Sequence, residues 1–521
     1  MSHTPLLRAL LRAAGQVDAA AGPRPPVSRR TLLKGSAVGA GSLAGLGAYT
    51  MASAPASHAA KAPSTLRVAV IGGGLAGLTA AYRLKVAGHT ATVYEAAGRV
   101  GGRCWTDRGT FGGQTAERGG ELIDSSHKQL RGLITELGLQ SVDLLRAEPA
   151  GSAPIYHFDG AVYDQATAQA DLTPVVAQAR RDAAAAGFPT LYNSFTARGQ
   201  QLDRMSIRDW INAYVPGGIA SRVGQLLDIA YTIEYGAETS QQAALNLIYL
   251  FGYQNKVDIQ LFGPSDEKFA VRGGNDQVAT ALAARLPGQV RLGTELRALA
   301  RRTDGTWAVT VGPAGGGGTA STVVADRVVL ALPFSTLRRV DLTGAGFPAR
   351  KLQAIRELQM GTNSKLHLQF SSRLWYERGC NGETYADTGY QNTWEVTRGQ
   401  AGTPGILVDY TGGRAGADFG TLTPAAYARR FLGQLEPVLP GITAKWNGKV
   451  LLDNWTTYPW TRGSYSYYGV GQYTTITGVE REAVNGCHFA GEHTSIDFQG
   501  YLNGAVETGE RAAREIIAAV R

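Results

Sequence analysis

Three glycines and one glutamate early in the sequence have the types and spacing needed to bind a dinucleotide. Gly72, Gly74 and Gly77 form the pattern G-x-G-x-x-G. The first allows a sharp turn, the second lets a pyrophosphate approach the backbone, and the third lets a helix pack closely on a strand. Glu95 ends the next apolar stretch and can accept hydrogen bonds from a ribose diol. NAD remains one option for the ligand, and a tight turn without a ligand is the less favoured alternative.

These four residues need a strand, a helix and a second strand to hold them. Residues 66–71 are mostly apolar, as in a parallel strand that is buried on both faces. Residues 75–87 are predicted to form a helix that ends near Gly88, and residues 91–95 the next strand. The N-terminus of that helix offers free N–H groups and a positive dipole end to phosphates. The glycine pattern therefore lies in the βαβ context that makes it specific.

Two further glycine-rich segments extend the pattern. Residues 98–103 (GRVGGR) follow Glu95 closely, and residues 489–494 (FAGEHT) precede residues 500–513 (GYLNGAVETGERAA). In this order the segments resemble the flavin amine oxidases, the family of monoamine, polyamine and L-amino-acid oxidases. NAD enzymes do not carry the second segment. The resemblance spans almost the whole chain after its N-terminal segment, and it implies FAD as the cofactor.

The resemblance also implies the fold class, which is α/β. We expect a Rossmann-type FAD-binding domain (GR2-like flavoprotein) at residues 64–127, 266–346 and 461–521. An α+β substrate-binding domain would occupy residues 128–265 and 347–460. Local patterns predict helices at 203–214, 241–249 and 276–286, and strands at 307–311 and 322–332 joined by a hairpin tip at 315–318.

The resemblance implies further contacts with the cofactor, in addition to those of Gly72, Gly74, Gly77 and Glu95. The helix that starts near Leu502 would point its N-terminus at the pyrimidine edge of the isoalloxazine, where a positive helix end stabilises anionic reduced flavin. The other implied contacts are Arg99, Gly102 and Arg103 at the pyrophosphate, and Gly491 and Glu492 at the pyrophosphate and ribityl chain.

The resemblance implies three catalytic residues. Residues 361–368 alternate as a strand, and in the family a lysine at the position of Lys365 holds a water against flavin N5. Tyr501 matches one wall of the family's aromatic cage, and Tyr465 is the candidate for the other, with Tyr467 and Tyr468 close by in sequence. Aromatic faces orient an amine by dipole or cation–π attraction. Ordinary strand or core roles are the alternatives for all three residues.

The attachment of the flavin is predicted from Ser464. Mitochondrial monoamine oxidases attach their flavin through a cysteine just before the second cage tyrosine, and this chain has Ser464 there. We therefore expect non-covalent FAD.

The class of substrate depends on the residues after the second glycine segment. Animal-type L-amino-acid oxidases carry an arginine in this region for the substrate carboxylate, whereas this chain has Glu121 near that place and an arginine at Arg118. A carboxylate facing the pocket would suit an amine cation. Glu121 could instead pair with Arg118 or Arg103, and Arg272 could supply a carboxylate contact.

We therefore expect oxidative deamination of an amine by hydride transfer to flavin N5, hydrolysis of the imine, and reoxidation by O2 to give H2O2. An L-amino-acid oxidase that produces a 2-oxo acid is the alternative. An FAD-dependent desaturase or isomerase, or a non-catalytic flavin-binding protein, is less favoured. The sequence leaves the identity of the substrate and a homodimeric state open.

Residues 1–56 resemble an export signal of the Tat type. Ser28-Arg29-Arg30 begins a twin-arginine segment, which is followed by an uncharged run rich in Gly and Ala and by small residues around Ala52–Ala54. The resemblance implies export of the folded protein to the periplasm or outside the cell, with the Tat translocon as a transient partner.

Charge and cysteine content exclude other classes. The net charge of +9 is mild for this length, and much of it lies in residues 1–56, so we expect no nucleic-acid partner. The three cysteines show no metal-ligand spacing, and we expect no metal.

Overall fold

The dinucleotide unit forms a parallel sheet at one end of the molecule. The computed structural model describes residues 66–252 and 265–520, so the predicted export signal lies outside the described residues. The predicted βαβ unit is present, with α2 (Leu75–Val86) between the first two strands. The strand order is β21-β13-β1-β2-β9, and all four pairings are parallel. The strands are β1 (Val68–Ile71), β2 (Ala91–Tyr94), β9 (Val290–Arg291), β13 (Arg327–Leu330) and β21 (Cys487–Phe489).

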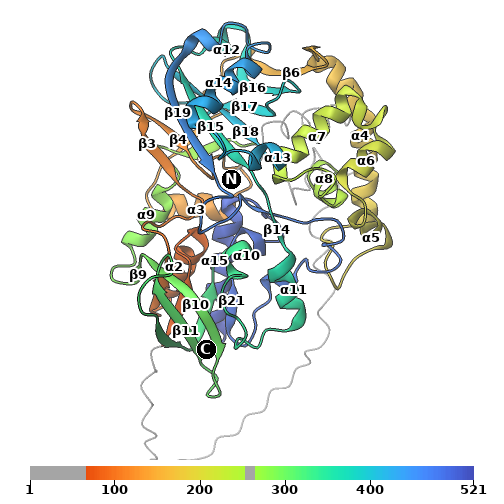
Figure 1. Cartoon of the computed structure of the whole chain (residues 1–521). Coiled ribbons are helices and arrows are strands. Elements are labelled where there is room, and N and C mark those ends of the chain that lie inside the picture. Colours follow the sequence, from red (N-terminus) through yellow and green to blue (C-terminus); the bar gives the residue numbers. More distant parts are fainter. Residues whose placement is uncertain (1–65, 253–264, 521) are drawn as a thin grey trace, which may run out of the picture.

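A mixed seven-stranded sheet lies at the other end of the molecule (Figure 1). Its order is β19-β15-β18-β17-β16-β6-β7, and α14 (Pro424–Leu435) packs on the apolar side chains of one face. Every residue of β15 is buried, including Lys365, because this strand lies between two neighbours and under a helix. The strands are β6 (Ala153–Phe158), β7 (Ala161–Val162), β15 (Ser364–Phe370), β16 (Cys380–Ala386), β17 (Asn392–Glu395), β18 (Gly405–Thr411) and β19 (Trp446–Asn454).

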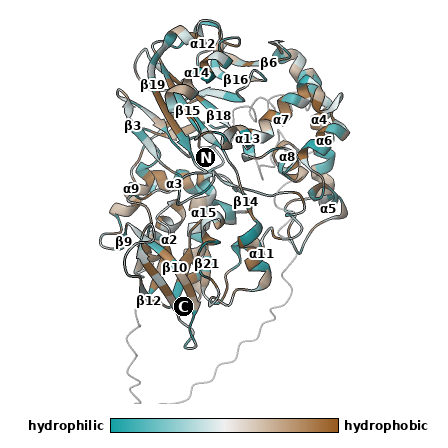
Figure 2. Cartoon of the chain, in the orientation of Figure 1, coloured by the Kyte–Doolittle hydropathy of each residue, from teal (hydrophilic) through white to brown (hydrophobic). Residues whose placement is uncertain are grey.

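A group of helices lies beside the seven-stranded sheet and covers it on one side (Figure 1). The helices are α4 (Gln165–Ala186), α5 (Ala197–Asp203), α6 (Ile207–Tyr214), α7 (Arg222–Tyr235) and α8 (Ala244–Phe251). Their buried apolar residues join one core with the inner face of the sheet. Figure 2 shows apolar and hydrophilic colours mixed on the strands of this sheet and on the helices beside it. No described helix is both long and apolar enough to cross a bilayer.

The remaining strands form smaller sheets and two-stranded ribbons. The antiparallel sheet β10-β11-β12 has the glycine-rich tip predicted at 315–318, and two-stranded ribbons pair β3 with β4, β5 with β8, and β14 with β20. The strands are β3 (Thr106–Phe111), β4 (Gln114–Glu117), β5 (Ser141–Asp143), β8 (Phe269–Val271), β10 (Thr294–Arg301), β11 (Trp307–Pro313), β12 (Ser321–Ala325), β14 (Gln359–Met360) and β20 (Ser466–Tyr467). The helices are α3 (Lys128–Glu136), α9 (Gln277–Ala284), α10 (Phe334–Leu337), α11 (Ala349–Glu357), α12 (Leu374–Glu377), α13 (Gly413–Ala417) and α15 (Leu502–Ala518).

Two predicted elements are each divided in the structure. The helix predicted at 203–214 is wrong as one helix, because Ser206 and Asp209 form a capping box that starts α6 after α5 has ended. The strand predicted at 322–332 is wrong as one strand, because the chain leaves the hairpin sheet at Asp326 and enters the parallel sheet as β13. The Asp326 carboxylate accepts a hydrogen bond of 2.8 Å from the backbone N–H of Arg67 at this change.

Close packing of α15 on α2 depends on Gly509. A Cβ atom at Gly509 would lie 2.3 Å from the carbonyl oxygen of Ala76, which is backbone and cannot turn away. We expect Gly509→Ala to lower the thermal unfolding midpoint, at a cost of about 1–3 kcal/mol for overpacking. Gly433→Ala is the matched control, because Gly433 is also a helical glycine and a Cβ atom there would meet no neighbouring atom within 4 Å. It should stabilise the protein by about 0.5–1 kcal/mol, and equal effects of both changes would contradict the prediction.

Candidate active site

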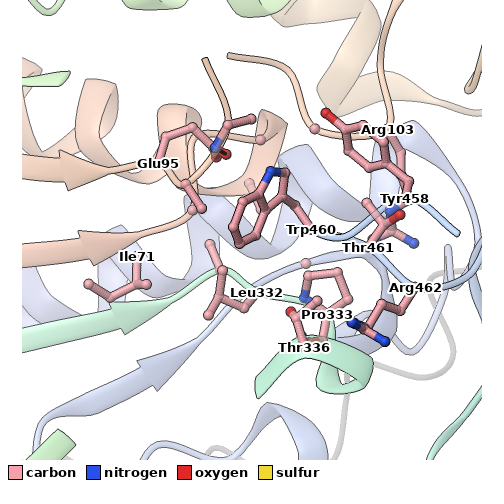
Figure 3. A pocket seen from close by; sticks show the side chains of 18 of the residues that line it. Ile71, Glu95, Arg103, Leu332, Pro333, Thr336, Tyr458, Trp460, Thr461 and Arg462 are labelled. Atoms are coloured by element: carbon pink, nitrogen blue, oxygen red, sulfur yellow. Dashed lines mark hydrogen bonds between the residues drawn. The ribbon is translucent and has the colours of Figure 1, made fainter. Parts of the chain in front are cut away.

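A cavity of about 490 Å³ opens at the carboxyl edge of the parallel sheet, where the three glycine-rich segments meet. Its size falls within the range of cofactor sites, roughly 300–1,000 Å³. Figure 3 shows Glu95 on one side of the view and Tyr458 and Arg462 on the other, with Trp460 between them. The predicted site residues that line it are Gly72, Gly74, Glu95, Gly102, Arg103, Tyr465, Gly491, Glu492, Tyr501 and Leu502.

The carboxylate of Glu95 is fixed by two backbone N–H groups. Its Oε2 accepts a hydrogen bond of 2.6 Å from Gly73, and its Oε1 accepts one of 2.7 Å from Ala97. Burial raises the pKa of Glu95 above its ordinary value, and these hydrogen bonds oppose that rise. Each oxygen can still accept a second hydrogen bond, so the residue is suited to a ribose diol at the cavity wall.

Arg103 and Glu492 join the second and third glycine segments. Arg103 Nη1 donates to Glu492 Oε1 at 2.8 Å and to the carbonyl of Ser464 at 2.8 Å. Glu492 Oε2 also accepts hydrogen bonds from the hydroxyl of Ser466 and from the N–H of Gly500. Burial opposes ionisation of Glu492, but the charge of Arg103 and the hydrogen bonds outweigh it and hold its pKa below the ordinary value.

Two residues assigned to the cofactor shape the site from behind the wall. Gly77 packs against the loop, since a Cβ there would lie 2.0 Å from the carbonyl oxygen of Gly72. Arg99 donates to the carbonyls of Val100 and Gly102, and its guanidinium lies 4.0 Å from the ring centroid of Trp105. Neither residue lines the cavity among the residues described.

The two candidate cage tyrosines both reach the cavity. The Tyr465 hydroxyl donates to the carbonyl of Ile233 at 3.0 Å and lies 2.9 Å from the hydroxyl of Tyr410. The ring of Tyr501 packs at 4.8 Å against His127, whose pKa burial lowers to about 3. Burial also raises the pKa of both tyrosines well above the ordinary value. Both hydroxyls are therefore neutral at physiological pH.

The neighbouring tyrosines take other positions. The hydroxyl of Tyr468 donates to Glu480 at 2.7 Å, and Tyr467 pairs with Gln359 in the β14–β20 ribbon. Tyr468 lines a second, small cavity of about 40 Å³, which shares Tyr501 with the large one. Tyr465 is thus the member of this group that meets the large cavity in the described part of the chain.

Lys365 is paired with Glu121. Lys365 Nζ donates to Glu121 Oε2 at 2.6 Å and to the carbonyls of Glu117 and Gly119 at 3.0 Å each. Trp394 Nε1 donates to the other oxygen of Glu121 at 3.1 Å. Both charged side chains are buried, and neither lines the large cavity among the described residues.

The arginines considered as partners of Glu121 bind elsewhere. Arg118 donates to Asp453 at 2.7 Å, and Arg103 to Glu492. The side chain of Arg272 is exposed and takes no part in the cavity wall. The partner of Glu121 is therefore Lys365 and neither of the two arginines.

Several wall residues are not among the site residues predicted from the sequence. Leu332, Pro333 and Thr336 follow β13, and Trp460 lies just before Thr461 and Arg462 (Figure 3). The rule that ligands bind outside the carboxyl ends of parallel strands would have identified the segment after β13. Trp460 belongs to the stretch that contains Tyr465, but its indole could be placed only in three dimensions.

Comparisons with known proteins relate the chain to flavin-containing oxidoreductases. The family described as flavin containing amine oxidoreductase matches residues 75–517. A protein of Mycobacterium tuberculosis described as a flavin-containing monoamine oxidase is 28% identical over 88% of this chain and 97% of its own length. An L-amino acid dehydrogenase of Synechocystis is 24% identical over 86% of this chain and 94% of its own length.

Solved structures share the fold. The cyclohexylamine oxidase from Brevibacterium oxydans IH-35A superposes with a TM-score of 0.75 at 22% sequence identity, covering 88% of this chain and 100% of its own. The predicted α/β class with a Rossmann-type FAD-binding fold is confirmed, as is the resemblance drawn from the order of the motifs. The chain therefore belongs to the flavin-containing amine oxidoreductase family and is an enzyme of the flavin-dependent amine oxidase type.

Proposed function

We propose that the chain holds FAD in the large cavity and oxidises the C–N bond of an amine. The bound flavin supplies the hydride acceptor, water hydrolyses the imine, and O2 restores the cofactor with release of H2O2. One observation carries the proposal: the cavity lined by all three glycine-rich segments is also lined by the tyrosine pair Tyr465 and Tyr501. The wall thus combines phosphate-binding backbone with two neutral aromatic side chains that can orient an amine.

The charges near Tyr501 favour an amine over an amino acid. Burial is the main cause of the raised pKa of Tyr501, and the negative charges of Asp124 and Glu267 add to it. Both acids are buried, and Asp124 accepts a hydrogen bond of 2.8 Å from the N–H of Glu267. Negative charge close to Tyr501 favours a substrate cation beside this ring and disfavours a substrate carboxylate there. Arg118, which could have bound a carboxylate, is committed to Asp453.

A peroxide-coupled assay of the purified yellow protein tests the proposal. Primary and secondary amines without a carboxylate should release H2O2, and the matching L-amino acids should be poor substrates. Turnover of L-amino acids alone, with a 2-oxo acid as product, would establish the alternative activity instead. Flavin that no amine reduces would refute the proposed reaction and favour a desaturase, an isomerase or a non-catalytic flavoprotein.

The surroundings of Ser464 support non-covalent attachment of FAD. The Ser464 hydroxyl is buried and donates to Asn363 Oδ1 at 2.6 Å. Of the three buried cysteines, Cys104 reaches the cavity wall, and burial raises the pKa of its thiol well above the ordinary value. A protonated thiol is a weak nucleophile. We expect trichloroacetic acid to release the yellow cofactor into the supernatant, and a yellow pellet would show a covalent bond.

We also propose that the chain is exported through the Tat translocon, on the basis of Arg29 and Arg30 in the N-terminal segment. Replacing both by lysine keeps the charge and removes the twin-arginine signal. The expected result is retention of active flavoprotein in the cytoplasm, measured by cell fractionation. Unchanged export of the variant would exclude this route.

A further inference from the structure

The ion pair of Lys365 and Glu121 uses every hydrogen that the lysine can donate. An ammonium has three N–H donors, and Lys365 Nζ has three acceptors within 2.6–3.0 Å. Glu121 is held in turn by Trp394, whose ring centroid lies 5.3 Å from the ammonium. The exposed fractions of the two charged side chains are only 2% and 5%, so each charge depends on the other for compensation.

The other ionisable groups around this pair add no net charge. Arg118 and Asp453 form a second ion pair, and Asp453 lies opposite Lys365 in the register of β15 and β19. Burial and the neighbouring Glu121 charge raise the pKa of Glu117 to about 8, so it is largely protonated at neutral pH. Burial lowers the pKa of His367 well below its ordinary value, and its imidazole is neutral. The cluster as a whole is therefore neutral.

The pair lies directly behind the cavity wall. Lys365 binds the carbonyl of Gly119, and the next residue, Gly120, donates its N–H to the carbonyl of Arg103 at 3.0 Å. Gly119 itself packs closely against Arg103. A Cβ atom added at Gly119 would lie 1.9 Å from the Arg103 carbonyl oxygen. Arg103 lines the cavity. A charge left uncompensated on this pair would consequently act on a bound flavin across one layer of backbone.

We propose that Lys365 and Glu121 act as one neutral unit beside the bound flavin, a proposal that rests on the function proposed above. Glu121 is a positioning residue in this unit: it fixes the ammonium of Lys365 and cancels its charge. The lysine therefore presents an oriented dipole to the flavin rather than a free cation. It follows that Glu121 is not the group that recognises the substrate amine, because Lys365 compensates its charge and it does not line the large cavity among the described residues.

A charge cycle on the holoenzyme tests the unit without any substrate. The midpoint potential of the bound flavin is measured in Glu121→Gln, Lys365→Met and the double variant. Glu121→Gln leaves an excess positive charge, which should favour anionic reduced flavin by about tenfold at a fixed solution potential. Lys365→Met leaves an excess negative charge and should shift the potential in the opposite direction. The double variant restores neutrality and should return close to the wild-type potential.

The directions of the shifts in flavin potential distinguish this role from a purely structural one. Shifts of the two single variants in the same direction, or a double variant whose shift exceeds both, would overturn the proposal. Glu121→Asp keeps the charge and should retain the wild-type potential. If Glu121→Gln does not fold, the comparison of Lys365→Met with the double variant still tests the proposal, because these two variants differ in charge.

A matched control removes a carboxylate from another ion pair of the same sheet. Glu395 pairs with Arg373 at 2.6 Å and has a fully buried side chain, and it does not line the large cavity among the described residues. Glu395→Gln should lower the unfolding midpoint and leave the flavin potential unchanged.

A wild-type protein that binds no flavin would refute the proposed function. A flavoprotein whose single variants do not shift the flavin potential in opposite directions would refute only the charge unit.

Discussion

Replacing Arg103 by methionine is expected to yield protein that purifies with little or no flavin. The guanidinium ties Glu492 to the carbonyl of Ser464, and through them it holds the second and third glycine segments together. Without it the Glu492 carboxylate remains buried with its charge uncompensated, which costs about 3–5 kcal/mol in comparable buried pairs. The cavity also loses a cation at the place where the family resemblance puts the pyrophosphate. The ratio of flavin to protein after purification, and the affinity for added FAD, measure the loss.

Two further variants separate cofactor binding from stability. Arg103→Met combined with Glu492→Gln removes the uncompensated charge, so it should recover much of the unfolding midpoint but not the affinity for FAD. Arg302→Met is the control for losing an arginine, because Arg302 forms an exposed pair with Asp304 and does not line the cavity among the described residues. It should purify fully yellow. Full flavin content in Arg103→Met would show that the arginine has no role at the cofactor.

The cofactor half of the molecule could be predicted from the sequence because its signals are local. The apolar run before Gly72, the glycines themselves and Glu95 lie within one βαβ unit, and each has a direct backbone role there. Gly72 has φ +106°, a conformation that residues with a side chain rarely adopt. The predictions of one helix at 203–214 and one strand at 322–332 were wrong for equally local reasons. The capping box at Ser206 and the change of sheet at Asp326 interrupt elements whose residue patterns continue across them.

The pairing at Lys365 could not be predicted because it depends on the register of distant segments. Lys365 lies on β15, and Glu121 follows the β3–β4 ribbon, far away in sequence. Proximity in sequence favours Arg118 as the partner of Glu121. In the structure it contacts Asp453 on β19, which places its guanidinium over Trp105 with a centroid distance of 3.6 Å. Only the juxtaposition of β15, β19 and the ribbon assigns each charge its partner.

Asp409 lies within the apolar face of the seven-stranded sheet, away from the large cavity. It is buried on β18 opposite Leu366, and its Oδ1 has no hydrogen-bond partner in the described part of the chain. Burial raises its pKa to about 8, and the distant charge of Arg430 only partly opposes this. The folded state therefore binds a proton on Asp409 more tightly than the unfolded chain does. Stability falls as the pH rises from the unfolded pKa of about 4 towards the folded value.

Asp409→Asn should consequently stabilise the protein in alkaline solution and have little effect in acid. The amide cannot ionise, so the variant avoids a loss of ~1.4 kcal/mol for each pH unit between the two pKa values. The measurement is the difference in unfolding midpoint between variant and wild type at acidic and at alkaline pH. Asp304→Asn is the control with the opposite sign: hydrogen bonds from Thr306 lower the pKa of this exposed acid to about 2, so its removal offers no alkaline gain. An equal gain for Asp409→Asn at both pH values would mean that its carboxyl group does not titrate on folding.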